Sequence, residues 1–395
     1  MYLNAIEEKM LDGEYGEITA RMMRLLVRLG EIYGAEDMIP VSMVQVAGVS
    51  YKSIGDPGTE FLEDIANKGA RVSVPSFLNP AGMDLEKWKE LGFPEDFAEK
   101  QCRIIDSFKK MGVTISATCT PYLAGALPHF REHIAWSESS AVSFANSVIG
   151  ARTNREGGPS ALASAICGRT PRYGLHLDEN RAPTVLVNVS TSLRDMADFG
   201  ALGYYLGKII KNQIPYFVGI KGARTEDLKA LGAAMAATGA VALYHIEGIT
   251  PEAEKFSNTE FEDRINVGDE EIREVYDKFG ADNADAVFIG CPHASINEIA
   301  EIAEMLKGKK VKKTLWVFTS RCVKALAEYA GYAGIIESAG GKLVCDTCMV
   351  VSPIERMGFS TTAVNSGKAA HYLPGFCKQK VIFGKIKDII GRVVE

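Results

Sequence analysis

The stretch Ile289-Gly290-Cys291-Pro292-His293-Ala294-Ser295 decides how the fold is interpreted. It follows an apolar run at residues 286–288, which predicts a buried strand, and it precedes residues 296–307, which have apolar side chains at helical spacing. Open α/β sheets place their chemistry where a strand ends and a helix begins. We therefore expect a functional side chain at this cysteine.

Two further cysteine sites have the same setting. Residues 116–121 (SATCTP) follow a predicted strand at 113–117, and residues 345–348 (CDTC) follow another at 342–344. Soft thiolates favour iron–sulfur, zinc or copper(I) sites, and zinc would favour paired CxxC motifs, of which the chain has one. We expect three of these thiols to hold an iron–sulfur cluster, which leaves one iron open as a Lewis acid.

Composition narrows the possible functions. The chain has 395 residues, 47% of them hydrophobic and 24% charged, with a formal net charge of −6. This length predicts two or three domains, and the charge argues against nucleic-acid or membrane binding driven by bulk electrostatics. No basic segment followed by an apolar one opens the chain, and the uncharged run at 230–244 is short of the ~20 residues of a membrane span. A soluble, cytoplasmic protein with reduced thiols is expected.

Strand and helix patterns alternate along the whole chain. Strands are predicted at 38–49, 70–74, 113–117, 184–189, 216–220, 241–245, 286–288, 314–319 and 342–344, and helices at 18–34, 59–67, 95–111, 141–149, 192–211, 225–238, 272–280, 296–307 and 323–332. This alternation predicts an α/β protein with several doubly wound parallel-sheet domains. Weak divisions at 178–183 and 250–269 suggest domains at 1–183, 184–269 and 270–395.

Polar turns follow several predicted strands. Residues 48–55 (GVSYKSIG) suit an anion cradle or an ordinary loop, and residues 75–82 bring an asparagine to the same sheet edge. Residues 136–140 (WSESS) either cap a helix or orient a substrate hydroxyl and transfer a proton. Two arginines among the glycines of residues 150–159 suit bidentate anion recognition or a solvated loop.

The turn at residues 365–372 (NSGKAAHY) contains Gly367-Lys368 but lacks the spacing of a P-loop. It remains a candidate contact for a phosphate or carboxylate. His245, at a predicted strand end, is either catalytic or a satisfied structural histidine.

Together these motifs resemble the large subunit of the aconitase X family, within the aconitase-like hydro-lyases. The resemblance covers nearly the whole chain and rests on residues 48–50 (GVS), 77–80 (FLNP), 117–122 (ATCTPY), 137–140 (SESS), 146–159, 290–293 (GCPH), 346–349 (DTCM) and 365–371.

The resemblance implies a [4Fe–4S] or related cluster held by Cys119, Cys291 and Cys348. Ordinary aconitases use a lone cysteine followed by a CxxC pair, which would correspond instead to Cys291, Cys345 and Cys348. We prefer Cys119 because its turn is small and polar, whereas Cys345 continues an apolar strand. The implied substrate pocket comprises Gly48, Val49, Ser50, Asn79, Pro80, Glu138, Ser139, Ser366, Gly367 and Lys368.

The family also implies the reaction. Members with a fused small swivelling domain resemble cis-3-hydroxy-L-proline dehydratases, and archaeal-type members keep that domain as a separate chain. A length of 395 residues leaves room for the large body alone. The implied reaction dehydrates (R)-5-phosphomevalonate to trans-anhydromevalonate 5-phosphate in a modified mevalonate route to isoprenoids.

In that reaction Glu138 and Ser139 would be catalytic, with the main base, a serine, on the small subunit. Lys368 would bind the phosphate, with Lys52 and Arg152 as reserves. The alternatives are a hydroxyproline dehydratase, and a cluster-free or zinc-stabilised binding protein of the same fold.

Overall fold

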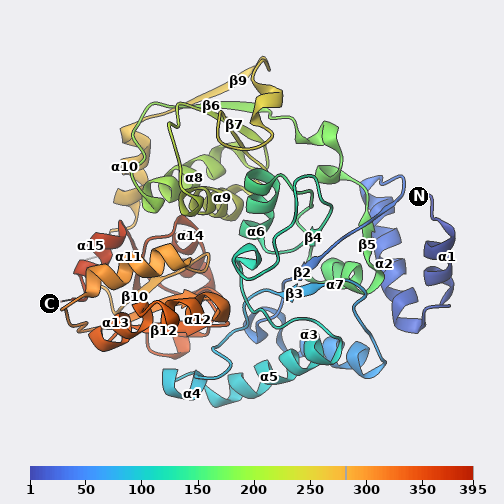
Figure 1. The fold of residues 1–395 in the computed structure, drawn as a ribbon, viewed down its shortest axis with the longest axis horizontal. Coiled ribbons are helices and arrows are strands. Elements are labelled where there is room, and N and C mark those ends of the chain that lie inside the picture. Colours follow the sequence, from blue (N-terminus) through green and yellow to red (C-terminus); the bar gives the residue numbers. More distant parts are fainter. Residues whose placement is uncertain (281–282, 395) are drawn as a thin grey trace.

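A computed structural model describes residues 1–280 and 283–394, and it alternates helices and strands along the chain (Figure 1). Three separate parallel sheets organise the N-terminal, middle and C-terminal parts. The expected α/β class with several parallel sheets is therefore confirmed. In the parts of the chain so described, no helix is both long enough and apolar enough to cross a bilayer.

The N-terminal part, coloured blue to green in Figure 1, is built around the parallel sheet β3-β2-β4, with a small antiparallel pair β1-β5 beside it. Its elements are α1 (Ala5–Asp12), α2 (Glu17–Tyr33), β1 (Met38–Pro40), β2 (Val44–Val46), α3 (Tyr51–Asn67), β3 (Ser76–Leu78), α4 (Trp88–Leu91), α5 (Glu95–Lys110), β4 (Ala135–Trp136), α6 (Ser139–Phe144) with a π-helical continuation (Ala145–Ile149), α7 (Gly158–Cys167) and β5 (Arg169–Pro171). Helix α2 forms because Ile18, Met22 and Leu26 recur at helical spacing and bury one face.

The middle part contains the parallel sheet β8-β7-β6-β9. Its elements are β6 (Val185–Val189), α8 (Met196–Ile210), β7 (Pro215–Val218), α9 (Thr225–Gly239), β8 (His245–Ile246), β9 (Asp263–Val267) and α10 (Asp269–Lys278). Helices α8 and α9 approach closely, because a side chain at Gly203 would lie 2.5 Å from the carbonyl oxygen of Leu231. Helix α9 lies next to α6 and α14 and so connects this part to both others.

The C-terminal part, orange to red in Figure 1, contains the five-stranded parallel sheet β12-β11-β10-β13-β14. Its elements are β10 (Ala286–Ile289), α11 (Ile296–Leu306), β11 (Thr314–Thr319), α12 (Arg321–Tyr329), α13 (Tyr332–Ala339), β12 (Lys342–Cys345), β13 (Thr361–Val364), α14 (Gly367–Cys377), β14 (Lys380–Phe383) and α15 (Ile386–Gly391). The apolar strand interiors, such as residues 286–289, are buried throughout, as parallel strands covered on both faces require.

Backbone hydrogen bonds and ion pairs join the N-terminal and C-terminal parts. Ala81 pairs with Thr347 as an isolated parallel bridge, and the N–H of Ala81 donates to the carbonyl of Asp346 at 2.7 Å. Arg321 lies between the carboxylates of Asp84 and Asp346, and Asp84 also accepts from the backbone N–H of Cys345 at 2.9 Å. The turn after β12 is therefore held by both parts.

Several predicted strands and helices differ from the observed elements. Residues 70–74 are not a strand, because Val72 and Ser73 donate instead to the carbonyls of Met111 and Ala165. Residues 113–117 make one bridge, from Thr114 to Phe77, before Ala117 enters the left-handed region at φ 41°. Residues 38–49 form two strands, and residues 241–245 join a strand only at the end. The elements that were not predicted are α1, α4, α7, α13, α14, β3, β4, β5, β9 and β13.

Candidate active site

The carboxyl ends of two sheets meet at one cavity of about 240 Å³. Strands β2, β3 and β4 of the N-terminal sheet end directly before Ala47, Asn79 and Ser137. Strands β10 and β12 of the C-terminal sheet lead into Cys291 and Cys348. All five residues line the cavity, so the site is assembled from both sheet edges, as parallel sheets favour.

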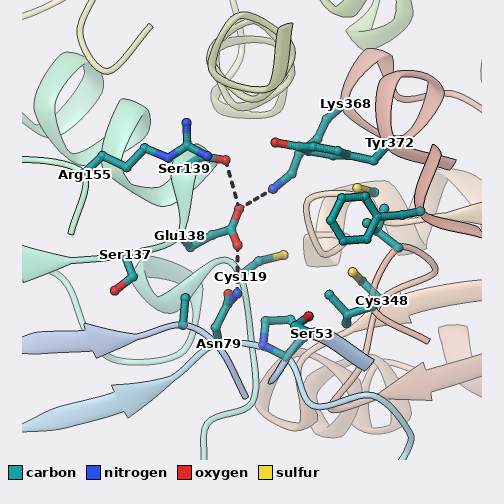
Figure 2. A pocket seen from close by; sticks show the side chains of 16 residues that line it. Ser53, Asn79, Cys119, Ser137, Glu138, Ser139, Arg155, Cys348, Lys368 and Tyr372 are labelled. Carbon is teal, nitrogen blue, oxygen red and sulfur yellow. Dashed lines mark hydrogen bonds and ion pairs between the residues drawn. The ribbon is translucent and has the colours of Figure 1, made fainter. Parts of the chain in front are cut away.

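Three cysteines from distant parts of the sequence line this cavity: Cys119, Cys291 and Cys348. They are 4%, 4% and 7% exposed, so they are accessible mainly from the cavity. The side chains of Cys291 and Cys348 lie close enough for each to shift the pKa of the other, and the backbone N–H of His293 donates to the sulfur of Cys119 at 3.2 Å. Figure 2 shows the sulfur atoms of Cys119 and Cys348 turned toward the same space.

Each cysteine turn has a residue in the left-handed backbone region shortly before the thiol. These residues are Ala117, Gly290 and Asp346, with φ values of 41°, 101° and 62°. At Gly290 a side chain would lie 2.1 Å from the carbonyl oxygen of Phe318, so this position requires glycine. At Ala117 and Asp346 the conformation costs about 1 to 2 kcal/mol per residue, which is typical of functional sites.

The carboxylate of Glu138 forms the polar centre of the cavity (Figure 2). It forms an ion pair with the ammonium of Lys368, and its Oε2 accepts from Asn79 Nδ2 at 2.8 Å. The hydroxyls of Ser139 and Ser140 donate to its Oε1 at 3.4 and 3.2 Å. Glu138 also caps α6, accepting from the N–H of Ser140 at 3.4 Å, so both predicted roles, cap and cavity carboxylate, coexist.

The ion pair fixes the charge of both partners. Burial alone would raise the pKa of Glu138, but the charge and hydrogen bond of Lys368 outweigh it and lower this pKa to about 2. Burial would lower the pKa of Lys368, but the carboxylate of Glu138 raises it well above its usual range. At neutral pH the pair is therefore a carboxylate and an ammonium, and both groups keep these protonation states across the neutral pH range.

The positive charge of the Lys368 ammonium also acts on the thiols of Cys119, Cys291 and Cys348. Burial raises the pKa of Cys119 to about 12, and the hydrogen bond to Cys348 raises that of Cys291. The hydrogen bond from Cys291 lowers the pKa of Cys348 to about 7, helped by the N–H groups of Val351 and Val350. The positive charge of Lys368 lowers the pKa of all three thiols, so it favours the thiolates that a metal cluster needs.

Cys345 does not line the cavity. It ends β12, pairs with Thr319 of β11, and is fully buried, and burial raises its pKa to about 12. The structure thus brings Cys119, rather than Cys345, next to Cys291 and Cys348. Of the remaining cysteines, Cys102 and Cys322 are exposed and Cys167 and Cys377 are buried.

Five of the ten predicted pocket residues line the cavity: Asn79, Pro80, Glu138, Ser139 and Lys368. The other five do not line it. Ser50 caps α3 and donates to the carbonyl of Val351 at 2.8 Å, and Ser366 caps α14 and donates to the carbonyl of Cys291. The other three are Gly48, which lines a neighbouring apolar cavity, Val49, which is buried in the core, and Gly367, which packs against the backbone of Gly200.

The two alternative residues predicted to bind the phosphate, Lys52 and Arg152, do not line the cavity. Lys52 pairs with Glu355 at 2.8 Å and donates to the carbonyl of Ser352. Arg152 is buried and pairs with Asp178 and Glu252. Neither lines the cavity, so neither is available to a ligand there. His245 is also buried outside the cavity, with Nε2 2.9 Å from the carbonyl oxygen of Arg181, so it is a structural histidine.

Several residues that line the cavity were not among the ten predicted pocket residues: Ala47, Ser53, Ser137, Arg155, Val350, Val351, Tyr372 and Phe376. Ser53, Ser137, Arg155 and Tyr372 do belong to predicted motifs, and Arg155 is one of the two arginines predicted to suit an anion. Tyr372 also lies one helical turn after Lys368. This spacing from Lys368 could have predicted that Tyr372 lines the site. No sequence pattern could have predicted the apolar lining residues.

The donor set at the cavity is chemically suited to an iron–sulfur cluster. Thiolates are the ligands that hold such clusters. Three buried thiols line one cavity next to a cation that favours their thiolate form.

Comparison with known proteins places the chain in a family. Three family models match it consecutively: Aconitase X first domain over residues 1–179, second domain over 183–277 and third domain over 284–395. The chain belongs to the aconitase X family. The resemblance inferred from the motifs is confirmed, and the family extends over almost all of the sequence.

Individual relatives of this aconitase X chain cover its full length. The phosphomevalonate dehydratase large subunit of Methanocaldococcus jannaschii is 57% identical over an alignment of 401 residues that covers 99% of each protein. The cis-3-hydroxy-L-proline dehydratase of Pseudomonas aeruginosa is 35% identical over an alignment of 407 residues that covers 99% of this chain and 70% of that protein. The crystal structure of Thermococcus kodakaraensis aconitase X in its holo form matches with a TM-score of 0.94 at 49% identity, covering 100% of both chains.

Proposed function

We propose that this chain is the cluster-bearing large subunit of a hydro-lyase that dehydrates (R)-5-phosphomevalonate to trans-anhydromevalonate 5-phosphate. The observation that carries the proposal is the single cavity in which three cysteines face the Glu138–Lys368 pair. The 57% identity to a phosphomevalonate dehydratase large subunit supports the choice of substrate.

Cys119, Cys291 and Cys348 would hold a [4Fe–4S] or related cluster. When bound, such a cluster supplies an open iron, which is a Lewis acid that weakens the C–O bond of a coordinated hydroxyl. The positive charge of Lys368 favours the three thiolates that hold it. This cofactor is part of the proposal.

The residues around Glu138 would orient the substrate. In the part of the chain that the structure describes, the buried Oδ1 of Asn79 has no hydrogen-bond partner, while Nδ2 is fixed on Glu138. That oxygen can accept a hydrogen bond from a substrate hydroxyl. Because Glu138 stays ionised, it acts as a hydrogen-bond acceptor that holds Asn79, Ser139 and Lys368 in place, not as a proton donor.

Arg155 is the cation that would bind the substrate phosphate. Of the described residues that line the cavity, Lys368 and Arg155 are cationic, and Lys368 is already neutralised by Glu138. Arg155 is exposed at the cavity and its guanidinium makes one long hydrogen bond, 3.5 Å to the carbonyl of Ala236. A guanidinium suits bidentate contact with a phosphate.

A separate small subunit would complete the site and carry the serine base that removes the proton. Phe376 lines the cavity yet is 53% exposed, so an apolar side chain lies uncovered at its mouth. An exposed apolar side chain beside a reaction cavity fits a surface that a partner covers.

The test is anaerobic reconstitution of the chain with iron and sulfide, with and without the small subunit, followed by assay on (R)-5-phosphomevalonate and on cis-3-hydroxy-L-proline. We expect dehydration of phosphomevalonate only when both subunits are present. Turnover of hydroxyproline instead would favour the second substrate, to which the 35% identical relative points. A colourless chain without iron or acid-labile sulfide would contradict the hydro-lyase proposal.

A further inference from the structure

The imidazole of His293 lies between the turns that carry the three cysteines. It is fully buried, two residues after Cys291, and its ring contacts Thr118 and Thr347. These two threonines directly precede Cys119 and Cys348 in the sequence. One side chain thus touches the residue next to each of the other two thiols.

The contacts of the ring leave one consistent arrangement of hydrogens. Nε2 is 2.8 Å from the carbonyl oxygen of Thr347, which only accepts, so Nε2 carries the hydrogen. Nδ1 of the neutral ring then accepts from the hydroxyl of Thr118 at 2.9 Å. That hydroxyl oxygen in turn accepts from the N–H of Thr120 at 3.2 Å. Every polar atom of the ring is therefore used.

The backbone of His293 adds two further contacts. Its N–H donates to the sulfur of Cys119 at 3.2 Å. Its carbonyl accepts from Lys229 Nζ at 2.9 Å, and Lys229, from α9 of the middle part, is buried in an ion pair with Glu298. The position of His293 is consequently fixed from the N-terminal, middle and C-terminal parts together.

Thr118 and Thr347 need such support, because each follows a residue in the left-handed region. Ala117 and Asp346 have φ values of 41° and 62°, and neither is glycine. A strained turn persists only where surrounding contacts over-determine it. The hydrogen bonds to His293 are contacts of this kind, one at each strained turn.

We propose that His293 is a positioning residue that sets the relative placement of the three cysteine turns by bonding Thr118 and Thr347 at once. This inference rests on the proposed function, in which those cysteines hold an iron–sulfur cluster. Hydrogen-bond partners that orient metal ligands typically contribute about 10- to 100-fold to metal affinity. Loss of the bridge through His293 should therefore weaken cluster retention more than it weakens the fold.

Two variants test the bridge, each with a matched control. His293→Phe removes both ring hydrogen bonds, and His245→Phe removes a fully buried histidine that bonds one carbonyl outside the cavity. Thr118→Val removes one hydroxyl, and Thr362→Val removes another buried hydroxyl, which donates to Gln379 at 2.8 Å. His293→Gln, whose amide both donates and accepts, serves as the conservative replacement.

The measurements are iron and acid-labile sulfide per chain after anaerobic reconstitution, the rate of iron loss to EDTA, and the unfolding temperature of the cluster-free chain. We expect iron loss to accelerate about 10-fold or more in His293→Phe and Thr118→Val. The two controls should lower the unfolding temperature of the cluster-free chain by a comparable amount while iron loss keeps its wild-type rate. His293→Gln should fall between wild type and His293→Phe.

Two outcomes would overturn the inference in different ways. If the wild-type chain binds a cluster and both test variants lose iron at the rate of their controls, His293 is an ordinary core residue. If the wild-type chain takes up no iron, the proposed cluster fails, and the positioning role fails with it. Should His293→Phe not fold, Thr118→Val decides between the alternatives.

Discussion

The carboxylate of Glu138 and the ammonium of Lys368, 230 positions apart in the sequence, form an ion pair inside the cavity. Glu138 caps the helix that follows β4, and Lys368 is in the first turn of the helix that follows β13. Two strand ends from different sheets are therefore joined by charge at the centre of the site.

Replacing Lys368 with methionine should abolish most activity. The change leaves the Glu138 carboxylate buried without its cation and removes the charge that favours the three thiolates. We expect kcat to fall at least ~100-fold and the unfolding temperature to drop, because an unpaired buried charge costs about 3 to 5 kcal/mol. Activity and thermal unfolding of the reconstituted complex are measured together.

Lys52→Met is the matched control for that variant. Lys52 forms a partly buried ion pair with Glu355 but does not line the cavity. We expect the Lys52→Met variant to keep the kcat of the wild-type complex. Equal losses in both variants would mean that the effect of Lys368 comes from stability alone.

The ion pair also predicts how the site responds to pH. The pKa of Glu138 is lowered from its ordinary value of 4.5, so its ionised form stabilises the fold fully at pH values above 4.5. This contribution is lost as the pH falls through the folded-state pKa of about 2. Glu138→Gln should therefore be less stable than wild type at neutral pH, and the difference should shrink in acid. Chemical denaturation across that pH range measures it, and a constant difference would contradict the assigned pKa.

The four candidate cysteines are expected to differ in whether the cluster depends on them. Serine at Cys119, Cys291 or Cys348 should reduce bound iron and release the cluster, since each of these thiols lines the cavity. Serine at Cys345 should retain the cluster, because Cys345 lies in the core beside β11. Iron counts and the visible absorption band distinguish them, and loss of the cluster only in Cys345→Ser would show that the triad is wrong.

Arg155 should govern recognition of the phosphate. Arg155→Ala removes a charge-assisted contact, so KM for phosphomevalonate should rise about 10- to 100-fold with a smaller change in kcat. Arg155→Lys keeps the charge but loses the bidentate geometry and should be intermediate. Steady-state kinetics with mevalonate as a phosphate-free comparison measures the effect. An unchanged KM would place the phosphate elsewhere.

The sequence predicted the parts of the fold in which local pattern and tertiary structure agree. Residues 314–319 form the predicted strand, and α2 and α5 follow their apolar spacing closely. The predicted strand at residues 113–117 is wrong because the backbone turns into the left-handed region at Ala117. No sequence pattern predicts this conformation at a residue other than glycine. Helix α7 was missed because Gly158 and Pro159 at its start are typical of a loop.

The same limit applies to the candidate site. Residues at strand ends, such as Asn79 and Cys291, were found because parallel sheets expose their carboxyl edges. Arg155 was one of two arginines predicted to suit an anion, whereas Val350 and Phe376 line the cavity through the packing of separate parts, which no local pattern reports. Ser50 and Ser366 were placed in the pocket by resemblance, but here their hydroxyls cap helices and bond carbonyls of the cavity wall.

The distribution of the three thiols has a consequence for how the protein matures. Cys119 belongs to the first family domain and Cys348 to the third, and the bridge from Ala81 to Thr347 joins these two domains beside Cys348. During synthesis the first thiol emerges long before the last, so the set is complete only after the C-terminal sheet has formed. Under the proposed function, the cluster would therefore be inserted late, because a nascent chain lacking that sheet has no complete set of the three thiols.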